Sequence, residues 1–125
     1  MRSIKLPKST DEEKAARSKA IQYATFHAAR IPLQTAKYAL KVMELALRVA
    51  RVGNLNTITD SASGAAMAHS GVTSAGYNVR INVKSLKNTV QIDTLLAEMK
   101  EVDAKAGEID IELNQVLAER GGLSF

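Results

Sequence analysis

The feature that most constrains the fold is a run of apolar residues between positions 92 and 116, which alternate strictly three and four residues apart. The run comprises Ile92, Leu95, Met99, Val102, Ala106, Ile109, Leu113 and Val116. This spacing places every member on one face of an α-helix and is typical of coiled coils and helical bundles. Gly121 and Gly122 end the pattern. Two uses of this face remain open: packing within one chain, and contact with a second subunit.

A second apolar repeat lies between Pro32 and Gly53. Its members are Leu33, Ala36, Leu40, Met43, Leu47 and Ala50, and the stripe is widened by Val42, Leu45, Ala46 and Val49. Pro32 suits the first turn of a helix, where its missing amide hydrogen costs nothing, and Gly53 suits a left-handed position after the last turn. The pattern therefore predicts a helix from Pro32 that is buried on more than one side.

A shorter helix is predicted ahead of Pro32. Thr10 and Glu13 form a capping box, in which the Thr hydroxyl accepts from the Glu13 amide and the Glu13 carboxylate reaches back. Pro7 restricts the residue before it to extended geometry, so no helix continues through this point from the N-terminal side. We expect this helix to run to about Arg30 and to break at Ile31.

The stretch from Gly53 to Leu86 predicts a helix that is poor in large side chains. One face carries Gly64, Ala68, Gly71, Ala75, Asn78 and Asn82. Glycine inside a helix costs about 1 kcal/mol relative to alanine, which indicates a close helix neighbour or a ligand. The amides of Asn78 and Asn82 pair with another helix or with a ligand ring rich in donors and acceptors. Asp60 is either the helix N-cap or a site residue, and the two roles can coexist.

Composition narrows the class of protein. The 125 residues are 46% hydrophobic but only 4% aromatic, which favours a single all-α domain, residues 1–125, built as a bundle of about four helices. The absence of cysteine agrees with a cytoplasmic protein, and we expect neither a signal peptide nor a membrane span. His27 and His69 have no metal-ligand spacing, so no metal site is expected.

Charge is uneven along the chain. Residues 1–52 hold eleven Lys/Arg against four Asp/Glu, whereas residues 53–125 hold six against nine. A basic first half attracts polyanions such as nucleic acid, anionic lipid or a small polyanionic molecule. Because the chain has few aromatic residues and no nucleic-acid-binding motif, we expect only weak nonspecific attraction to nucleic acid.

Several segments together resemble the formiminotetrahydrofolate cyclodeaminase family, also called the cyclodeaminase/cyclohydrolase family. In order, they are Lys5-Leu6-Pro7-Lys8, Thr10-Asp11-Glu12-Glu13-Lys14, Ile31-Pro32-Leu33, Gly53-Asn54-Leu55-Asn56 with Thr59-Asp60, and Asn78-Val79-Arg80-Ile81-Asn82. No single segment is diagnostic, but the five occur in the family's order and spacing over essentially the whole chain.

The resemblance implies a dimeric helical bundle that acts on a one-carbon derivative of tetrahydrofolate, without a tightly bound cofactor. The reaction is either loss of ammonia with closure of the 5,10-methenyl bridge, or addition of water to that bridge. The residues expected to line the pocket are Asp60, Asn78, Arg80 and Asn82, with Lys5, Lys8 or Arg80 meeting the anionic glutamate tail. Asp60 is the candidate for positioning the pterin or a proton, and no residue is assigned as the catalytic acid.

The chain also departs from the family pattern. Family members are longer and carry, ahead of Leu-Pro-Lys, a glycine-rich segment and an acidic residue assigned as catalytic, and neither occurs in residues 1–125. We therefore expect this sequence to correspond to the C-terminal part of the family domain. Whether the chain alone is an enzyme stays open, and the alternative is a non-catalytic helical oligomer or a module completed by another chain.

Overall fold

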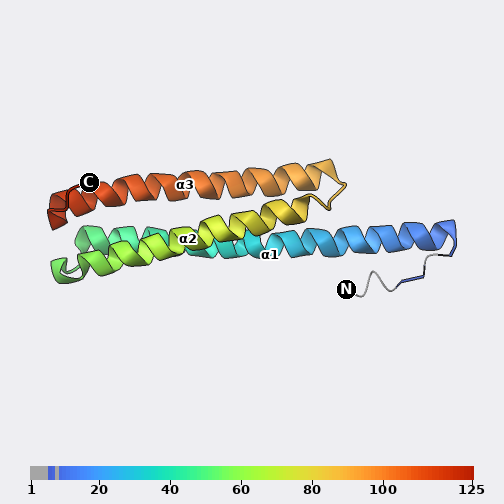
Figure 1. The fold of residues 1–125 in the computed structure, drawn as a ribbon, viewed down its shortest axis with the longest axis horizontal. Helices are drawn as coiled ribbons and strands as arrows, with labels where there is room; N and C mark the ends of the chain where they lie inside the picture. Colours follow the sequence, from blue (N-terminus) through green and yellow to red (C-terminus); the bar gives the residue numbers. More distant parts are fainter. Residues whose placement is uncertain (1–5, 8) are drawn as a thin grey trace.

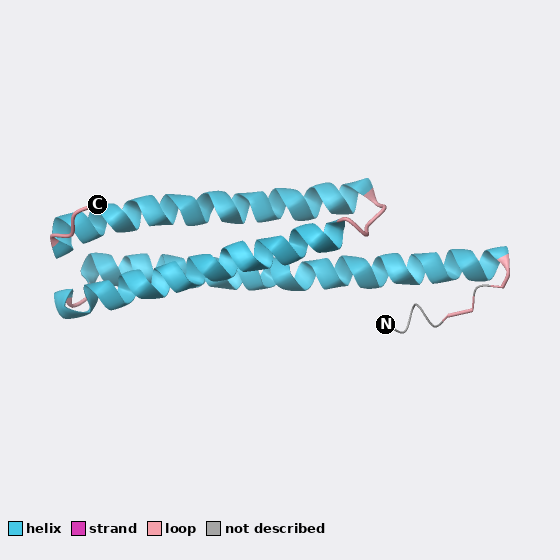
Figure 2. Cartoon of the chain, viewed as in Figure 1, coloured by secondary structure: helices cyan, strands magenta, loops and turns pink. Residues whose placement is uncertain are grey.

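Three long helices account for nearly all of the chain in the computed structural model, which describes residues 6, 7 and 9–125. The helices are α1 (Asp11–Val52), α2 (Ile58–Val83) and α3 (Thr89–Gly121), and a 3-10 turn, η2 (Leu55–Thr57), lies between α1 and α2. The three helices run alongside one another, each antiparallel to the one before it in the chain (Figure 1, Figure 2). The described part contains no strand, which confirms the all-α prediction.

The predicted break at Ile31 is wrong, because α1 continues through Pro32 without interruption. A proline inside a helix removes one hydrogen bond and crowds the carbonyl four residues earlier. Here Ala29 and Leu33, on either side of it, are buried in the core, and this packing outweighs the local preference. The two helices expected before Gly53 are therefore one, and the described residues form three α-helices where about four were expected.

Both ends of α1 were partly predicted. The Glu13 amide donates to the Thr10 hydroxyl at 3.0 Å, as expected for a capping box. The Glu13 carboxylate instead accepts from the hydroxyl of Ser9 at 2.9 Å. Gly53 follows α1 in an extended conformation, with φ −80°, so the left-handed position predicted for it is wrong. The terminal turn is held by Arg120 of α3, whose guanidinium donates to the carbonyls of Ala50 and Gly53.

The core lies along one face of each helix. We call the α1 residues of this face the inner seam: Ala29, Leu33, Ala36, Leu40, Met43, Leu47 and Ala50, all buried. The α3 face predicted from the strict repeat is also confirmed: six of its eight members are buried, and Ile92 and Val116 are partly buried against the core. Asn88 caps the start of α3 by accepting from the Gln91 amide at 3.1 Å.

A second apolar stripe on α1 faces away from the core. We call it the outer seam: Ile31, Thr35, Tyr38, Val42, Leu45, Val49 and Val52, all exposed. Its spacing is again four and three residues, and each member follows an inner-seam residue by two positions, which places it on the opposite side of the helix. The prediction that this helix is buried on more than one side is therefore wrong for the single chain.

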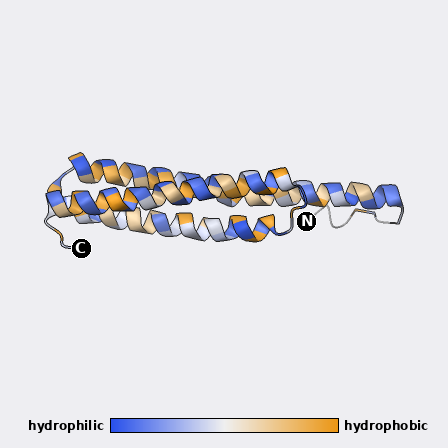
Figure 3. Cartoon of the chain, turned by 90° about the horizontal axis from the view of Figure 1, so that it is seen from above, coloured by the Kyte–Doolittle hydropathy of each residue, from blue (hydrophilic) through white to orange (hydrophobic). Residues whose placement is uncertain are grey.

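The N-terminal end of α1 extends past the other two helices (Figure 1). This overhang carries mainly hydrophilic residues (Figure 3). Where the overhang ends, Gln22 pins the turn between α2 and α3: its side chain donates to the Ser85 carbonyl at 3.0 Å and accepts from the Lys87 amide at 2.8 Å. No helix in the described part of the chain is long and apolar enough to cross a membrane.

Candidate functional site

The small-residue face of α2 borders a groove against α1 rather than the centre of the core. Of its members only Ala75 is fully buried, and the buried stripe of α2 instead comprises Ile58, Ala65, Val72, Ala75, Gly76, Val79 and Val83. The helices do approach closely at this face, since a Cβ on Gly71 would lie 3.6 Å from the Cβ of Ala39. A Cβ on Gly64 would meet nothing within 4 Å, so no close neighbour explains that glycine.

The α1–α2 groove encloses about 490 Å³. Its α1 wall is formed by Ala28, Ile31, Pro32 and Thr35, and its α2 wall by Gly71, Ser74, Ala75, Asn78 and Asn82. The walls are therefore small or apolar, with hydroxyl and amide groups at a few points. This combination is typical of small-molecule sites, in which a few placed polar groups orient the ligand.

Asn78 and Asn82 lie together in this groove, as their spacing predicts. Each amide nitrogen donates to the backbone of its own helix: Asn78 to the Ser74 carbonyl at 3.4 Å, and Asn82 to the Asn78 carbonyl at 2.8 Å. Neither amide bonds to another helix among the described residues. Each amide retains a second N–H and its carbonyl oxygen, so both can still donate to and accept from a ligand.

Arg80 points away from this groove. Its guanidinium donates to the Asp103 carboxylate of α3 at 2.7 Å. It also lies against Gly76 one turn earlier, where an added Cβ would come within 2.5 Å of its terminal nitrogen. The structure therefore separates Arg80 from the two asparagines and gives it a role in joining α2 to α3. Lys5 and Lys8 lie outside the described residues.

Asp60 lies at the other end of α2. It is the third residue of the helix and is exposed, so the N-cap prediction is wrong: the helix begins two residues earlier, with Thr57 at the cap position. The eighteen residues between Asp60 and Asn78 correspond to about 27 Å along the helix axis. One copy of the chain therefore does not bring Asp60 to the Asn78 and Asn82 groove.

A second groove, between α2 and α3, contains a pair that the sequence did not reveal. The His69 ring nitrogen Nδ1 lies 2.5 Å from the Asp110 carboxylate, and both side chains are partly exposed. The groove encloses about 730 Å³ and is further lined by Ser70, Thr73, Tyr77 and Asn114. His69 and Asp110 are 41 residues apart, and only the register between two helices makes them neighbours. No local sequence pattern could have indicated this pair.

His27 lies elsewhere, on α1, where it contacts the rings of Tyr23 and Phe26 with centroid separations of 4.4 and 6.0 Å. Among the described residues, no group of three or more His, Cys, Asp or Glu side chains is placed to hold a metal ion.

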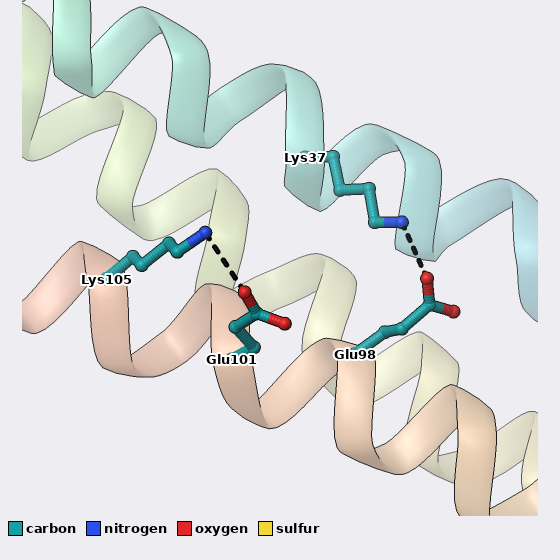
Figure 4. Close-up of polar contacts among 4 residues, drawn as sticks. All are labelled: Lys37, Glu98, Glu101 and Lys105. Carbon is teal, nitrogen blue, oxygen red and sulfur yellow. Dashed lines mark hydrogen bonds and ion pairs between the residues drawn. The ribbon is translucent and has the colours of Figure 1, made fainter.

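The acidic α3 neutralises part of the basic α1. Lys37 pairs with Glu98 at 3.0 Å (Figure 4). Arg51 pairs with Glu112 at 2.8 Å. Within α3, the hydrogen bond and charge of Glu101 raise the pKa of Lys105 above its ordinary value. The excess positive charge of the first half is thus partly used within the fold. The paired side chains, Lys37 and Arg51, are therefore less available to bind a polyanion.

Comparison with known proteins shows which protein family the chain resembles. A family profile described as formiminotransferase-cyclodeaminase matches residues 1–101. The chain is 36% identical over 115 residues to a methenyltetrahydrofolate cyclohydrolase of Methylorubrum extorquens, covering 92% of this chain and 55% of that protein. It is 33% identical over 105 residues to the formimidoyltransferase-cyclodeaminase of Rattus norvegicus, covering 78% of this chain and 19% of that protein. The corresponding protein of Gallus gallus is 34% identical over 113 residues, which cover 86% of this chain and 20% of that protein.

The chain thus spans about half the length of the bacterial relative and about a fifth of the animal ones. The profile match covers most of the chain, including the segments that contain Pro32, Asp60, Asn78 and Asn82. The chain belongs to the formiminotransferase-cyclodeaminase family, whose relatives named above are enzymes of folate one-carbon metabolism.

Proposed function

We propose that the chain binds a one-carbon derivative of tetrahydrofolate in the α1–α2 groove and serves a cyclohydrolase- or cyclodeaminase-type reaction there. The observation that carries the proposal is the position of Asn78 and Asn82, which belong to the family-like segment and line this groove with free hydrogen-bonding capacity. The names of the relatives supply the substrate class.

The groove suits a pterin ring, which is flat and has donors and acceptors along its edge. Asn78 and Asn82 offer both kinds of partner from one wall. On the other wall, the Ala28 carbonyl is the one that Pro32 cannot satisfy, because proline has no amide hydrogen. Ile31 and Ala75 provide apolar contact for the ring faces.

Two reactions fit this substrate class. In hydrolysis, the oxygen of water bonds to the methenyl carbon and one carbon–nitrogen bond of the bridge breaks. One proton of the water goes to the departing nitrogen, the other goes to solvent, and a formyl group remains. In the deaminase reaction, N10 attacks the N5-formimino carbon and ammonia leaves after protonation. Both need a proton donor near the carbon.

The groove of a single copy lacks such a donor among the described side chains. Its polar side chains are Thr35, Ser74, Asn78 and Asn82, which bind and orient but do not titrate near neutral pH. The proton donor therefore has to come from outside this wall. Asp60 remains the candidate, provided that another part of the assembly brings it to the groove.

Absorbance of the methenyl compound in the near ultraviolet provides the test. We expect the wild-type chain to bind 5,10-methenyltetrahydrofolate and to change the rate at which its absorbance decays. The Asn78→Ala and Asn82→Ala variants should each weaken binding about tenfold or more, since each removes a directed hydrogen bond. The His69→Ala variant is the matched control, because it alters the α2–α3 groove only. Unchanged binding by both asparagine variants would contradict the proposed site.

A second candidate function, a non-catalytic helical module, is favoured by the exposed outer seam of α1. On this alternative the chain binds the folate compound or another chain without turnover. A wild-type chain that neither forms nor hydrolyses the methenyl compound, yet assembles through the outer seam, would select it.

We further propose a cytoplasmic homodimer with no tightly bound cofactor. The cysteine-free sequence supports the compartment, and the exposed apolar face of α1 supports the assembly. The proposal includes the lyase activity of a cyclodeaminase and the hydrolase activity of a cyclohydrolase as alternatives. Ammonia release from the 5-formimino compound would identify the former.

A further inference from the structure

We propose that the α2–α3 groove is a second active site, in which His69, oriented by Asp110, attacks uncharged aryl esters as a nucleophile. The site is separate from the groove of Asn78 and Asn82 and does not depend on the proposed folate chemistry. Three features of the groove support it: an imidazole nitrogen free to react, polar side chains without partners beside it, and exposed aromatic rings along it.

The first feature is the tautomer that Asp110 imposes on His69. An ionised carboxylate only accepts hydrogen bonds, so the ring nitrogen Nδ1, 2.5 Å from it, carries the hydrogen. The other ring nitrogen, Nε2, then has a free lone pair, and no described residue bonds to it. The carboxylate also stabilises the positive charge that the ring gains when Nε2 reacts. His69 is therefore held in the form that a nucleophile needs.

The ion pair of Arg80 with Asp103 offers a contrast, because it also joins α2 to α3. Its atoms are 2.7 Å apart, and neither residue is among the described residues that line the groove. His69 and Asp110 both line the groove, and their side chains remain 31% and 41% exposed. Of these two pairs, a ligand in the groove can reach only the pair of His69.

Polar side chains without partners lie beside this pair. Thr73 lies one turn after His69 on the same face of α2, and Tyr77 lies one turn further. Asn114 lies one turn after Asp110 on α3. None of the three side chains Thr73, Tyr77 and Asn114 forms a hydrogen bond within the described part of the chain. They are therefore available to donate to a carbonyl oxygen that becomes negative during attack.

The groove favours an uncharged ligand with an aromatic ring. Among its lining side chains only Asp110 is an acid and only His69 is a base, so with a neutral imidazole the groove is negative and repels anions. Leu113 provides apolar contact, and the rings of Tyr77 and Phe125 are exposed at 68% and 77%. The groove encloses about 730 Å³, a size typical of small-molecule sites.

The reaction has two steps. In the first, Nε2 of His69 bonds to the ester carbonyl carbon, the bond from that carbon to the aryl oxygen breaks, and the phenolate leaves with the electron pair. The acylated ring is then positive and faces the Asp110 carboxylate. In the second step, the oxygen of water bonds to the acyl carbon and the carbon–nitrogen bond breaks. A carboxylate leaves, both protons of the water go to solvent, and His69 is restored.

Hydrolysis of p-nitrophenyl acetate, followed by the absorbance of nitrophenolate, tests the reaction. We expect His69→Gln to lower the rate above buffer background at least about tenfold. Asp110→Asn should lower kcat about threefold or more with KM unchanged, and Asp110→Glu should recover it, because Asp110 positions the ring. His27→Gln is the matched control, since His27 lies outside the groove. A wild-type rate in His69→Gln, or an equal loss in His27→Gln, would overturn the proposal.

Two further variants test whether the ester binds in this groove. Tyr77→Ala and Asn114→Ala should each raise KM about threefold or more, because they remove ring contact and a hydrogen-bond donor. Asn78→Ala should leave the ester reaction unchanged, because Asn78 lines the other groove. Ester hydrolysis without folate binding would leave this site standing and overturn the proposed function, and the reverse result would overturn this site alone. A KM unchanged in both Tyr77→Ala and Asn114→Ala would contradict binding in the groove.

Labelling with diethyl pyrocarbonate tests the site in the wild-type chain without any activity measurement. This reagent acylates neutral imidazole, and exposure alone favours His27, which is exposed where His69 is half-buried. We expect His69 to be labelled about threefold faster or more, as measured by peptide mass spectrometry. Phenol, which is uncharged near neutral pH, should slow labelling of His69 but not of His27. Faster labelling of His27, or no protection of His69 by phenol, would overturn the proposal.

Discussion

The two seams of α1 have the same spacing and similar side chains but opposite surroundings. The inner seam, with Leu40 and Met43 at its centre, is buried against α2 and α3, whereas the outer seam, with Val42 and Leu45 at its centre, is exposed. Apolar periodicity therefore indicates that a face is suited to burial. It does not say whether the covering partner belongs to the same chain. The difference lies in the presence of a neighbour, and the experiments below separate the two cases.

The largest expected effect is at the inner seam. Met43→Ala leaves a cavity in the core, where Met43 is fully buried, and should lower the free energy of unfolding by about 2–5 kcal/mol at any protein concentration. Leu45→Ala, two positions away, should matter only at concentrations where copies associate, because Leu45 is exposed in the single chain and would be covered only in the proposed dimer. Chemical denaturation at two protein concentrations measures both variants. A concentration-independent loss of several kcal/mol for Leu45→Ala would remove the distinction between the seams.

A smaller effect is expected where both seams end. Arg120 donates to the carbonyls of Ala50 and Gly53 and so holds the last turn of α1. Arg120→Met keeps most of the apolar stem and should cost about 1.5–3 kcal/mol, the usual contribution of hydrogen bonds from a charged group. If the outer seam needs this end in place, the variant should also weaken dimerisation. Denaturation and sedimentation of the same variant give the two numbers. Wild-type stability in Arg120→Met would show that these hydrogen bonds do not stabilise the last turn of α1.

The smallest effect concerns the outward face of α3, which is charged where that of α1 is apolar. Glu101 raises the pKa of Lys105, so the folded state favours the protonated amine. The resulting stabilisation is fully present below the ordinary pKa of 10.5 and is lost as pH rises through the raised value. The difference in stability between wild type and Lys105→Met should therefore be constant from neutral pH to about 10.5, where Glu101 is ionised, and shrink above it. A difference that grows with rising pH would contradict this sign.

Apolar spacing along a helix could be predicted from the sequence more reliably than the positions where helices end. The prediction that the α3 face from Leu95 to Leu113 is buried was correct, because a strict three-and-four repeat places all its members on one side of a helix. The predicted break at Ile31 was wrong because the local preference of Pro32 for the start of a helix was outweighed by burial of Ala29 and Leu33. The left-handed conformation expected at Gly53 was wrong for a similar reason, since Arg120 satisfies the helix end instead.

The candidate site was predictable only in part. Asn78 and Asn82 could be placed together because they are four residues apart on one helix. Asp60 and Arg80 lie on the same helix, but the residues of α1 and α3 that face them could not be predicted, since these depend on how α2 packs against the other two helices. The His69–Asp110 pair depends on the same packing. Spacing within a helix is visible in sequence, but the register between helices is set by the assembled core.

Sedimentation equilibrium of the unmodified chain tests most directly the claim that the outer seam is an interface. We expect a particle of twice the 13.5 kDa chain mass at micromolar concentration, and a return to the single mass for Leu45→Asp. Ile111→Asp is the matched control, because Ile111 is similarly exposed, at 63% against 56% for Leu45, but lies on α3 away from the seam. A single-mass particle in the wild type, or dissociation by Ile111→Asp instead of Leu45→Asp, would contradict the claim.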